Sequence, residues 1–357
     1  MRSPLIEHFT SDEVINRAFD WLCVRRQFYH FNNDVWQLRR WWALKKPLIV
    51  AQLRAGTYRL REQRVVRGGR EVKEIWAAQD ALVLKALAIV LQEELQPHLS
   101  PRCFHLAGTG GLKGAVREVA AHLHENEFVF RTDVKGYYAS INHDILFNLV
   151  SQYVREPMVL DLVRQYLKRF VSDSGEYTDI EQGISLGCPL SPLMGALYLK
   201  SLDDKMAEMG CFYVRYMDDW VILAPTRWKL RQAIKAVNQV MANLLVEKHP
   251  DKTFIGRISR GFDFLGYWFS PPGLGIARKT VERSLEKVSR LYEQGASDVR
   301  IGEYLGRWWQ WVRSGVNGVL MVGDDFVLCV VGGICFIYLP SCAAIALHLF
   351  MSPSPLS

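Results

Sequence analysis

The feature that most constrains the fold of this chain is a pair of apolar runs separated by two adjacent acids. Residues 212–216 (FYVRY) and 220–223 (WVIL) are rich in the aromatic and β-branched side chains that favour strands. Only Met217-Asp218-Asp219 lies between them, which leaves room for a tight turn and nothing larger. The sequence therefore predicts an antiparallel hairpin that carries two carboxylates at its tip.

A third carboxylate follows another strand-like run, since residues 128–130 (FVF) lead through Arg131-Thr132 to Asp133. Three carboxylates within a few ångströms repel one another, and hard divalent cations with oxygen ligands relieve that repulsion. Phosphoryl transfer uses such a cluster, because two Mg²⁺ ions about 3.5–4 Å apart activate the attacking hydroxyl and stabilise the leaving group. From spacing alone, however, a plain Asp-Asp turn is the simpler interpretation.

The rest of the chain predicts helices and short strands. Residues 11–100 are expected to be mostly helical, with Ser11-Asp12-Glu13 as a capping start and an apolar periodic stretch over 81–95. Within them, residues 58–72 alternate apolar and basic side chains around Gly68-Gly69, which predicts a ribbon with one charged face; a merely solvated hairpin fits as well. The later pattern predicts helices over 142–154, 192–209 and 230–244, turns over 172–176 and 183–192, and a strand pair over 252–269.

Composition and charge indicate a globular protein with a polyanionic partner. Its 49% hydrophobic and 23% charged residues exclude disordered, collagenous and disulfide-framework proteins for the bulk of the chain. All 44 Lys and Arg residues lie within residues 1–318, with 35 of the 37 acids, so this part carries a net charge of +9. The seven cysteines form no C-x-x-C pair and no zinc-site spacing with histidine, which indicates reduced thiols.

Five ordered blocks of residues resemble those of reverse transcriptases. Tyr216-Met217-Asp218-Asp219 resembles the palm signature of that family, and residues 131–141 (RTDVKGYYASI) resemble its first catalytic block. Between them, residues 183–192 (GISLGCPLSP) resemble the block that handles template and nucleotide. Residues 245–253 (LVEKHPDKT) and 262–267 (FDFLGY) resemble the two following blocks, the second being the primer grip. Over most of its length the chain resembles bacterial enzymes of the group II intron-like and stand-alone, defence-associated types.

The resemblance implies an α+β right-hand polymerase with fingers, a palm of antiparallel sheet plus helices, and a helical thumb. The implied boundaries are 1–125 for the N-terminal region and fingers, 126–271 for the palm with a fingers insertion at about 150–190, 272–318 for the thumb, and 319–357 for a hydrophobic C-terminal tail.

The resemblance also implies the catalytic residues. Asp133 and Asp218 are expected to bind both of two Mg²⁺ ions, or Mn²⁺ in their place, with Asp219 in support and the Val134 carbonyl as a further ligand. Lys252 is expected to protonate the departing pyrophosphate; a surface lysine without that role is the alternative.

Nucleotide and primer contacts are implied in the same way. Tyr138 matches the steric gate that favours dNTPs over NTPs, and Phe264-Leu265-Gly266 matches the primer grip. Arg64 and Arg70, or their neighbours Arg67 and Lys73 on the basic ribbon, are expected to hold the triphosphate.

One position departs from the pattern of the family. Where the family has Pro-Gln-Gly, this chain has Ser185-Leu186-Gly187, so an apolar leucine replaces a glutamine that contacts the incoming nucleotide. Leucine offers no hydrogen bond. Leu186 and Gly187 are still assigned to the nucleotide site, and we predict a specialised enzyme with restricted templates.

Two segments outside these blocks have expected roles. Residues 278–313 are expected to form a basic helical thumb whose arginines contact the duplex, while Trp308, Trp309 and Trp311 pack against a neighbour. Residues 108–114 (GTGGLKG) lack the Gly-Lys-Ser/Thr ending of a phosphate-binding loop, so a template-approaching loop at a helix start is expected instead.

The C-terminal tail differs from the rest of the chain in its apolar, uncharged segment. Residues 326–351 carry no formal charge over 26 positions, which exceeds the roughly 20 residues that cross a bilayer. A membrane helix that leaves the body cytoplasmic, a buried hydrophobic hairpin and a partner-binding segment are the three expectations for it. The N-terminus has no apolar run of the signal-peptide kind, so a cytoplasmic enzyme is expected.

The expected function is RNA-directed DNA polymerisation from an RNA template, a DNA or RNA primer and dNTPs. Stand-alone relatives imply a role in antiphage defence with a dedicated noncoding RNA, and self-association is left open. No ribonuclease H stretch or endonuclease block follows the thumb, so a self-sufficient mobile-intron protein is not expected. Two alternatives stay open: template-independent or protein-primed DNA synthesis, and a non-catalytic, maturase-like RNA-binding scaffold.

Overall fold

The computed structural model describes residues 5–68, 71–315, 321–322, 326–331, 334–338 and 345–347. The chain forms two compact units and passes between them several times. The first unit contains Met1–Leu106, Val134–Lys205 and Val237–Lys248, and the second contains Ala107–Asp133, Met206–Ala236 and His249–Ser357. The predicted boundaries of fingers, palm, thumb and tail stay a prediction.

The first unit is mainly helical, and the predicted helical character of residues 11–100 is confirmed. Ser11 is the N-cap of the second helix, where its hydroxyl accepts a hydrogen bond from the Val14 amide at 3.3 Å. Helix α5 is buried along most of its length and packs on α2. The helices are α1 (Leu5–Phe9), α2 (Asp12–Arg25), α3 (Asp34–Arg40), α4 (Trp42–Arg54), α5 (Ala78–Leu95), α7 (Tyr137–Ser140), α8 (His143–Tyr153), α9 (Pro157–Leu167) and α10 (Ser191–Tyr198).

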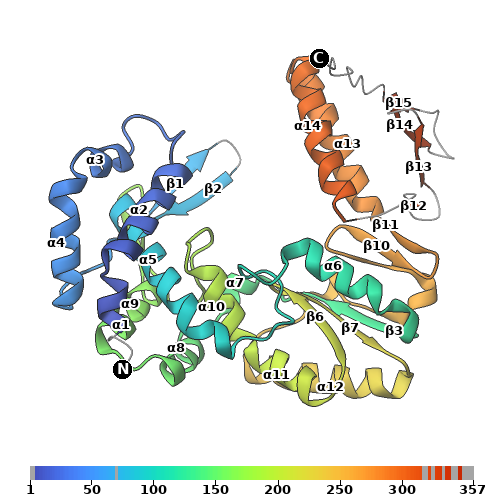
Figure 1. The fold of residues 1–357 in the computed structure, drawn as a ribbon, viewed down its shortest axis with the longest axis horizontal. Coiled ribbons are helices and arrows are strands. Elements are labelled where there is room, and N and C mark those ends of the chain that lie inside the picture. The colour runs from blue at the N-terminus through green and yellow to red at the C-terminus, as the bar shows by residue number, and fades with distance from the viewer. Residues whose placement is uncertain are drawn as a thin grey trace. The chain divides into compact units, whose positions relative to one another are not determined.

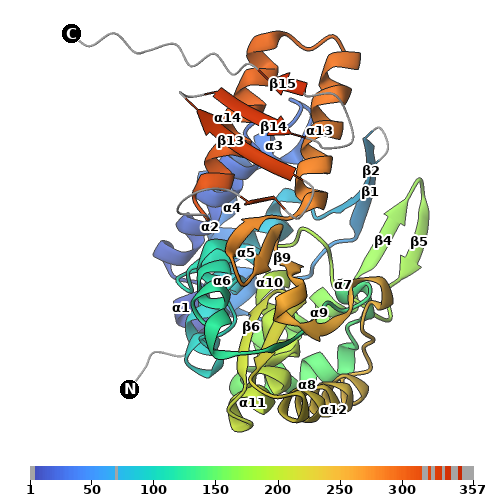
Figure 2. The same ribbon diagram turned by 90° about the vertical axis from the view of Figure 1, so that its right-hand side faces the viewer.

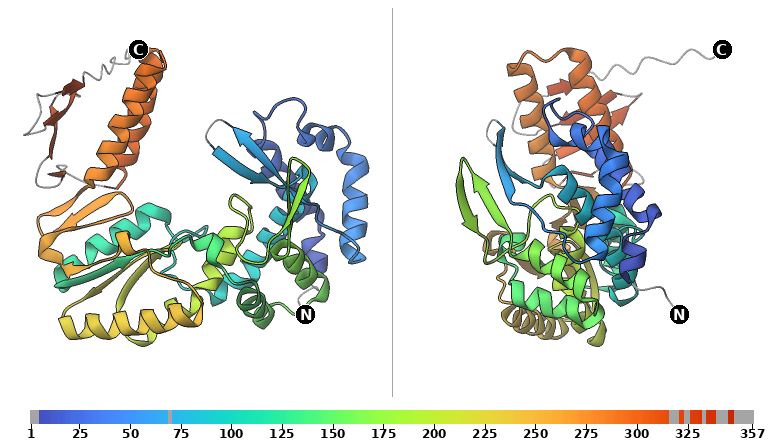
Figure 3. Two further views of the ribbon diagram at one scale, coloured as in Figure 1. Left: turned by 180° about the vertical axis from the view of Figure 1, so that it is seen from behind. Right: turned by 90° about the vertical axis from the view of Figure 1, so that its left-hand side faces the viewer.

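Two hairpins form one four-stranded sheet in this unit, and they lie side by side in Figure 3. The predicted basic ribbon is the hairpin of β1 (Gln63–Gly68) and β2 (Glu71–Ile75), and β1 pairs in parallel with β4 (Phe170–Asp173). The segment 172–176, which was predicted as a turn, contains the tip of a second hairpin, between β4 and β5 (Glu176–Asp179). The prediction missed these strands because β5 is exposed on both faces and shows no apolar alternation.

The second unit is built on a four-stranded sheet in the order β6-β7-β3-β8. Its strands are β6 (Phe212–Tyr216), β7 (Asp219–Ala224), β3 (Phe128–Thr132) and β8 (Phe254–Arg257), all antiparallel to their neighbours. Figure 1 shows α6 (Gly111–Ala121) on one face of this sheet and the start of α12 (Arg227–Asn243) on the other. The predicted acidic hairpin and the strand before Asp133 are both confirmed.

Two predicted elements differ in detail. The single helix predicted over 192–209 is divided at Leu199 into α10 and α11 (Lys200–Glu208). The strand pair predicted over 252–269 is split between two sheets: β8 joins the sheet of β3, whereas β9 and β10 form a separate three-stranded sheet with β11. These strands are β9 (Phe262–Phe264), β10 (Tyr267–Ser270) and β11 (Gly273–Ile276), and the short 3-10 helices are η1 (Gln96–His98), η2 (Leu123–Glu125), η3 (Pro250–Lys252) and η4 (Ile258–Arg260).

Two long helices follow, and they run side by side in Figures 1 and 2. They are α13 (Arg278–Glu293) and α14 (Asp298–Arg313), and they share an apolar cluster built on Val288, Leu291, Ile301 and Leu305. This pair confirms the predicted helical character of residues 278–313.

The described part of the tail consists of antiparallel strands. They are β12 (Met321–Val322), β13 (Phe326–Val331), β14 (Ile334–Tyr338) and β15 (Ile345–Leu347). Residues 332–333, 339–344 and 348–351 of the predicted apolar segment lie outside the described residues. Among the helices that the structure describes, none has the length and apolar character that a bilayer crossing requires.

Candidate active site

Strand register brings the three predicted aspartates to one end of the sheet in the second unit. The last pair between β3 and β7 is Thr132 with Trp220, so the next position in the same register places Asp133 opposite Asp219. The hairpin of β6 and β7 closes at the pair Tyr216 with Asp219, which leaves Asp218 in its two-residue loop. Asp133 and Asp219 are 86 positions apart in the sequence, and they come to the same end of the sheet because β3 and β7 pair in this register.

The loop of the acidic hairpin is held in a conformation that favours glycine. Met217 has φ of +57°, which costs a residue with a side chain about 1–2 kcal/mol. Arg215 is fully buried beneath the loop, and its Nη1 donates a hydrogen bond to the Met217 carbonyl at 2.9 Å. Sequence reasoning missed Arg215; the available signal was a charged residue in the middle of an apolar strand.

Burial and mutual repulsion act on the acids at this end of the sheet. Burial raises the pKa of Asp218, and the negative charge of Asp133 raises it further. Burial, together with the charges of Asp218 and Asp133, raises the pKa of Asp219 to about 7. The three carboxylates therefore interact electrostatically, as expected from the sequence.

Asp133 has one occupied and one free carboxylate oxygen. The residue is only 3% exposed, and its Oδ1 is buried without a hydrogen-bond partner. Lys252 donates from Nζ to Oδ2, and this hydrogen bond is the main reason why the pKa of Lys252 is raised. The structure thus brings the Lys252 ammonium to Asp133, while half of the lysine side chain stays exposed.

The chemistry of these side chains suits a divalent cation. A buried, unpartnered carboxylate oxygen beside two acids that repel it is a donor set for a hard cation. Within the described ranges, however, no three His, Cys, Asp or Glu side chains converge closely enough to hold an ion. Val134, the fourth expected ligand, is buried and forms an antiparallel bridge with Lys248 in the first unit.

The predicted steric gate lies in the first unit. The Tyr138 ring lies 5.6 Å from the Tyr137 ring, and a Cβ on Gly195 would approach each ring to within 3.2 Å. The Tyr138 carbonyl accepts a hydrogen bond from the Ile184 amide at 2.7 Å, which ties it to the predicted nucleotide block. The position of Tyr138 is therefore fixed by packing and by the backbone.

The loop with the unusual leucine rests on a buried polar network. Leu186 is 77% exposed, whereas Ser185 beside it is buried and accepts a hydrogen bond from Gln63 Nε2 at 2.6 Å. Gln63 Oε1 in turn accepts from Arg169 Nε at 2.7 Å, and Arg169 Nη1 donates to the Gly183 carbonyl at 2.9 Å. Gln63 and Arg169, which sequence reasoning missed, thus connect β1 and β4 to the predicted nucleotide block.

The basic ribbon is only partly available for a triphosphate. Arg64 is well exposed, with one nitrogen 3.8 Å from Glu62. Arg67 forms a two-pronged ion pair with Asp173, in which Nη1 lies 2.6 Å from Oδ1. Arg70 lies outside the described residues. Among the three arginines, the assignment of Arg64 is the one that the described geometry favours.

The predicted primer grip is a tight hairpin between β9 and β10. The pair Phe264 with Tyr267 closes it, and both loop residues have positive φ, +49° at Leu265 and +85° at Gly266. Two positive φ values are the requirement of a type I′ turn, for which glycine at the second position is suited. Phe264 is fully buried and anchors the hairpin.

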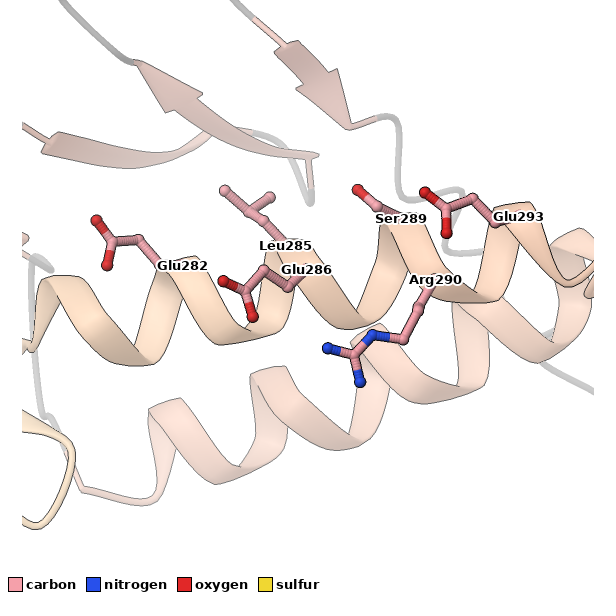
Figure 4. A pocket seen from close by; sticks show the side chains of 6 residues that line it. All are labelled: Glu282, Leu285, Glu286, Ser289, Arg290 and Glu293. Carbon is pink, nitrogen blue, oxygen red and sulfur yellow. The ribbon is translucent and has the colours of Figure 1, made fainter. Parts of the chain in front are cut away.

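Helix α13 carries basic and acidic side chains in neighbouring rows. Lys279, Arg283 and Lys287 are exposed and four residues apart, which places them along one side. Three glutamates line a pocket on this helix together with Arg290, as Figure 4 shows, and Glu282 and Glu286 lie three residues from Lys279 and Arg283. The residues of that pocket are Glu282, Leu285, Glu286, Ser289, Arg290 and Glu293. The predicted basic thumb therefore also carries acidic residues beside its cations.

Comparisons with known proteins agree with this geometry. The family model described as "Reverse transcriptase (RNA-dependent DNA polymerase)" matches residues 79–269, which is more than half of the chain.

Three relatives among curated proteins are intron proteins or bacterial proteins. The chain is 25% identical over 137 residues to an uncharacterized 91 kDa protein in the cob intron of Schizosaccharomyces pombe, covering 38% of this chain and 17% of that protein. It is 21% identical over 165 residues to the group II intron-encoded protein LtrA of Lactococcus lactis subsp. cremoris, covering 46% and 27%. It is 19% identical over 231 residues to protein YkfC of Escherichia coli, covering 54% and 61%. The chain thus spans less than two thirds of each of these relatives.

Among solved structures, a chain of a partial Cas6-RT-Cas1–Cas2 complex is similar with a TM-score of 0.43 and 18% identity, covering 68% of this chain and 42% of that chain. The family model and the α+β architecture of helices and antiparallel sheets lead to one conclusion. This chain belongs to the reverse transcriptase family and has a fold of the right-hand polymerase class.

Proposed function

We propose that the chain is an RNA-directed DNA polymerase that adds dNTPs to the 3′ end of a primer on an RNA template. The observation that carries the proposal is the pairing of β3 with β7, because its last pair, Thr132 with Trp220, directly precedes Asp133 on one strand and directly follows Asp219 on the other. Membership of the reverse transcriptase family supports the same reaction.

Asp133 and Asp218 would hold two Mg²⁺ ions, with Asp219 and the Val134 carbonyl in support. When bound, the ions supply Lewis-acid activation of the attacking 3′-hydroxyl and of the leaving pyrophosphate. The free Oδ1 of Asp133 and the raised pKa values of Asp218 and Asp219 support this assignment, because a cation would relieve both. Mn²⁺ is the alternative ion.

Other side chains have proposed roles in the same reaction. Lys252 keeps its proton, since Asp133 raises its pKa, and it would donate that proton to the departing pyrophosphate. Tyr138 would exclude a 2′-hydroxyl, and Arg64 would bind the triphosphate. The hairpin of Leu265 and Gly266 would hold the primer, while Leu186 and Gly187 would face the nucleotide and template.

The biological role that we propose is antiphage defence with a dedicated noncoding RNA, which the resemblance to stand-alone bacterial enzymes supports. Cells that carry the wild-type gene should resist phage better than cells that carry Asp218→Asn. Equal plaque counts for the two would remove this role. Sequencing nucleic acid that co-purifies with the protein would identify the RNA.

The polymerase proposal is tested with Asp218→Asn and a matched control. Asp218→Asn removes one carboxylate and should lower dNTP incorporation at least about 10³-fold while RNA binding persists. Asp251→Asn makes the same change at an exposed position near Lys252 and should leave incorporation within about twofold. Equal incorporation by Asp218→Asn and wild type would contradict the enzyme and favour a non-catalytic scaffold.

A further inference from the structure

The glycine-rich stretch before α6 contains a lysine whose position the proposed reaction does not explain. Lys113 is in the first turn of α6, and its Nζ lies 4.0 Å from the centre of the Trp311 ring and 4.6 Å from that of Tyr267. The same ammonium donates to the Trp311 carbonyl at 2.5 Å and contacts the Tyr267 hydroxyl. In the part of the chain that the structure describes, no carboxylate pairs with it.

These contacts join three elements of the second unit. Lys113 comes from α6, Tyr267 from the start of β10 and Trp311 from the last turn of α14, and the two aromatic rings are 5.0 Å apart. In this cluster Trp311 packs against a neighbouring aromatic side chain, as expected from the sequence. A helix beside the palm sheet is thereby fastened to the proposed primer grip and to the proposed thumb.

The tip of the primer-grip hairpin is part of the same cluster. The Gly266 carbonyl accepts hydrogen bonds from the Ala277 amide at 3.1 Å and from Thr280 Oγ1 at 3.0 Å, at the start of α13. A Cβ on Gly266 would lie 3.0 Å from the Trp311 ring, so the hairpin and α14 are in close contact. A change at Lys113 would therefore be transmitted to both the hairpin and the two thumb helices.

Lys113 is charged and partly desolvated at this place. Burial lowers its pKa to about 8, so the side chain remains mostly an ammonium at neutral pH. An ammonium that lies between the face of an indole ring and the face of a phenol ring is attracted to both rings. Its hydrogen bonds fix the direction from which it approaches them. The arrangement thus orients the rings relative to α6 as well as holding them together.

We propose that Lys113 is a positioning residue that fixes the base of the thumb and the primer grip relative to the palm sheet, and so sets the binding of primer and template. This inference rests on the proposed polymerase function for its role, but not for the anchoring itself. The stretch 108–114 would then act through its lysine rather than as a loop that approaches the template.

The first experiment measures the anchoring without nucleic acid or dNTP. Lys113→Met keeps the aliphatic stem and removes the charge, and it should accelerate hydrogen–deuterium exchange of residues 278–313 about tenfold. Lys113→Arg should keep the wild-type exchange rate within about twofold, because guanidinium also binds to aromatic faces. Arg117→Met, on an exposed position of the same helix, is the matched control and should change nothing. Unchanged exchange in Lys113→Met would overturn the anchoring.

The second experiment separates positioning from a merely structural role. Lys113→Met should weaken the Kd for a primer–template duplex about tenfold, while the KM for dNTP stays within about twofold, and Lys113→Arg should restore the Kd. Faster exchange with an unchanged Kd would overturn the positioning role. If Lys113→Met does not fold, Lys113→Gln is used with the same expectations. If every form, including the wild type, lacks polymerase activity, the proposed function is contradicted. The exchange experiment still decides whether Lys113 anchors the thumb helices.

Discussion

At the scale of single residues, the proposed active site is a set of acids that the folded chain brings together against their mutual repulsion. Asp219 shows this most clearly, since its pKa is raised to about 7 from an ordinary value of about 4. Between these two values the folded chain binds a proton that the unfolded chain does not. The contribution of Asp219 to stability therefore falls as the pH rises from 4 to 7, and it is least favourable above 7.

Asp219→Asn should accordingly stabilise the protein when metal is absent. We expect the variant to gain about 1–3 kcal/mol at pH 8 in the presence of EDTA, with a gain that shrinks as the pH is lowered toward 4. Thermal unfolding across this pH range measures the effect, and Asp251→Asn serves as the control. Adding Mg²⁺ should raise the Tm of the wild type more than that of the variant. A variant that is less stable than wild type at pH 8 would show that repulsion does not dominate there.

Leu186 gives a second prediction for a single residue. The side chain is 77% exposed, so Leu186→Gln should change the free energy of unfolding by less than about 0.5 kcal/mol. Any change in polymerisation would then report a contact with nucleotide or template. We expect the variant to accept a wider range of templates, as measured by fidelity and template choice in primer extension. No change in either property would remove the idea of a specialised enzyme.

At the scale of elements, the buried pair Gln63 and Arg169 connects two hairpins to the proposed nucleotide block. Arg169→Met would leave Gln63 Oε1 without its donor and the Gly183 carbonyl with only His143 Nε2, and it should cost about 2–4 kcal/mol of stability. Urea unfolding measures the loss. Lys168→Met, at the exposed neighbouring position, should cost less than about 0.5 kcal/mol. Equal losses for the two variants would mean that the network contributes nothing specific.

The charges of α13 give another prediction at this scale. Replacing Lys279, Arg283 and Lys287 together by Ala should weaken duplex binding and reduce its salt dependence, because fewer phosphate contacts release fewer counterions. Replacing Glu282, Glu286 and Glu293 by Gln is the matched change in the acidic residues, and it should leave binding equal or tighter. Titrations of labelled duplex at several salt concentrations compare the two. Weaker binding in the glutamine variant alone would reverse the assignment of the two sets of residues.

At the scale of the whole molecule, the charge is divided between a basic body and an apolar segment, residues 326–351, that carries none. Residues 1–318 carry a net charge of +9, while residues 326–351 carry none. Binding of primer–template by the full chain should therefore depend steeply on salt, with a loss of about tenfold or more in affinity between 50 and 200 mM. A Kd that does not change over this range would contradict a nucleic-acid interface on the basic body.

Local patterns in the sequence were enough to find the acids and the elements that carry them. Asp133 at the end of one strand, and Asp218 and Asp219 between two others, could be found from local patterns because strand and turn preferences act over a few residues. The same local rules found the helices of residues 278–313 and the ribbon around Gly68-Gly69. They could not find β5, whose exposed residues carry no apolar alternation.

The contacts that hold these elements in place became visible only in the folded chain. Two of these contacts join positions far apart in the sequence: the register of β3 with β7, which brings Asp133 toward Asp219, and the contact between Lys113 and Trp311. The third is made by Arg215, a charged residue that is unexpectedly buried beneath the hairpin loop. Such contacts depend on how a polar or charged group is satisfied once it leaves water, and a linear pattern holds no information on which distant partner will satisfy it.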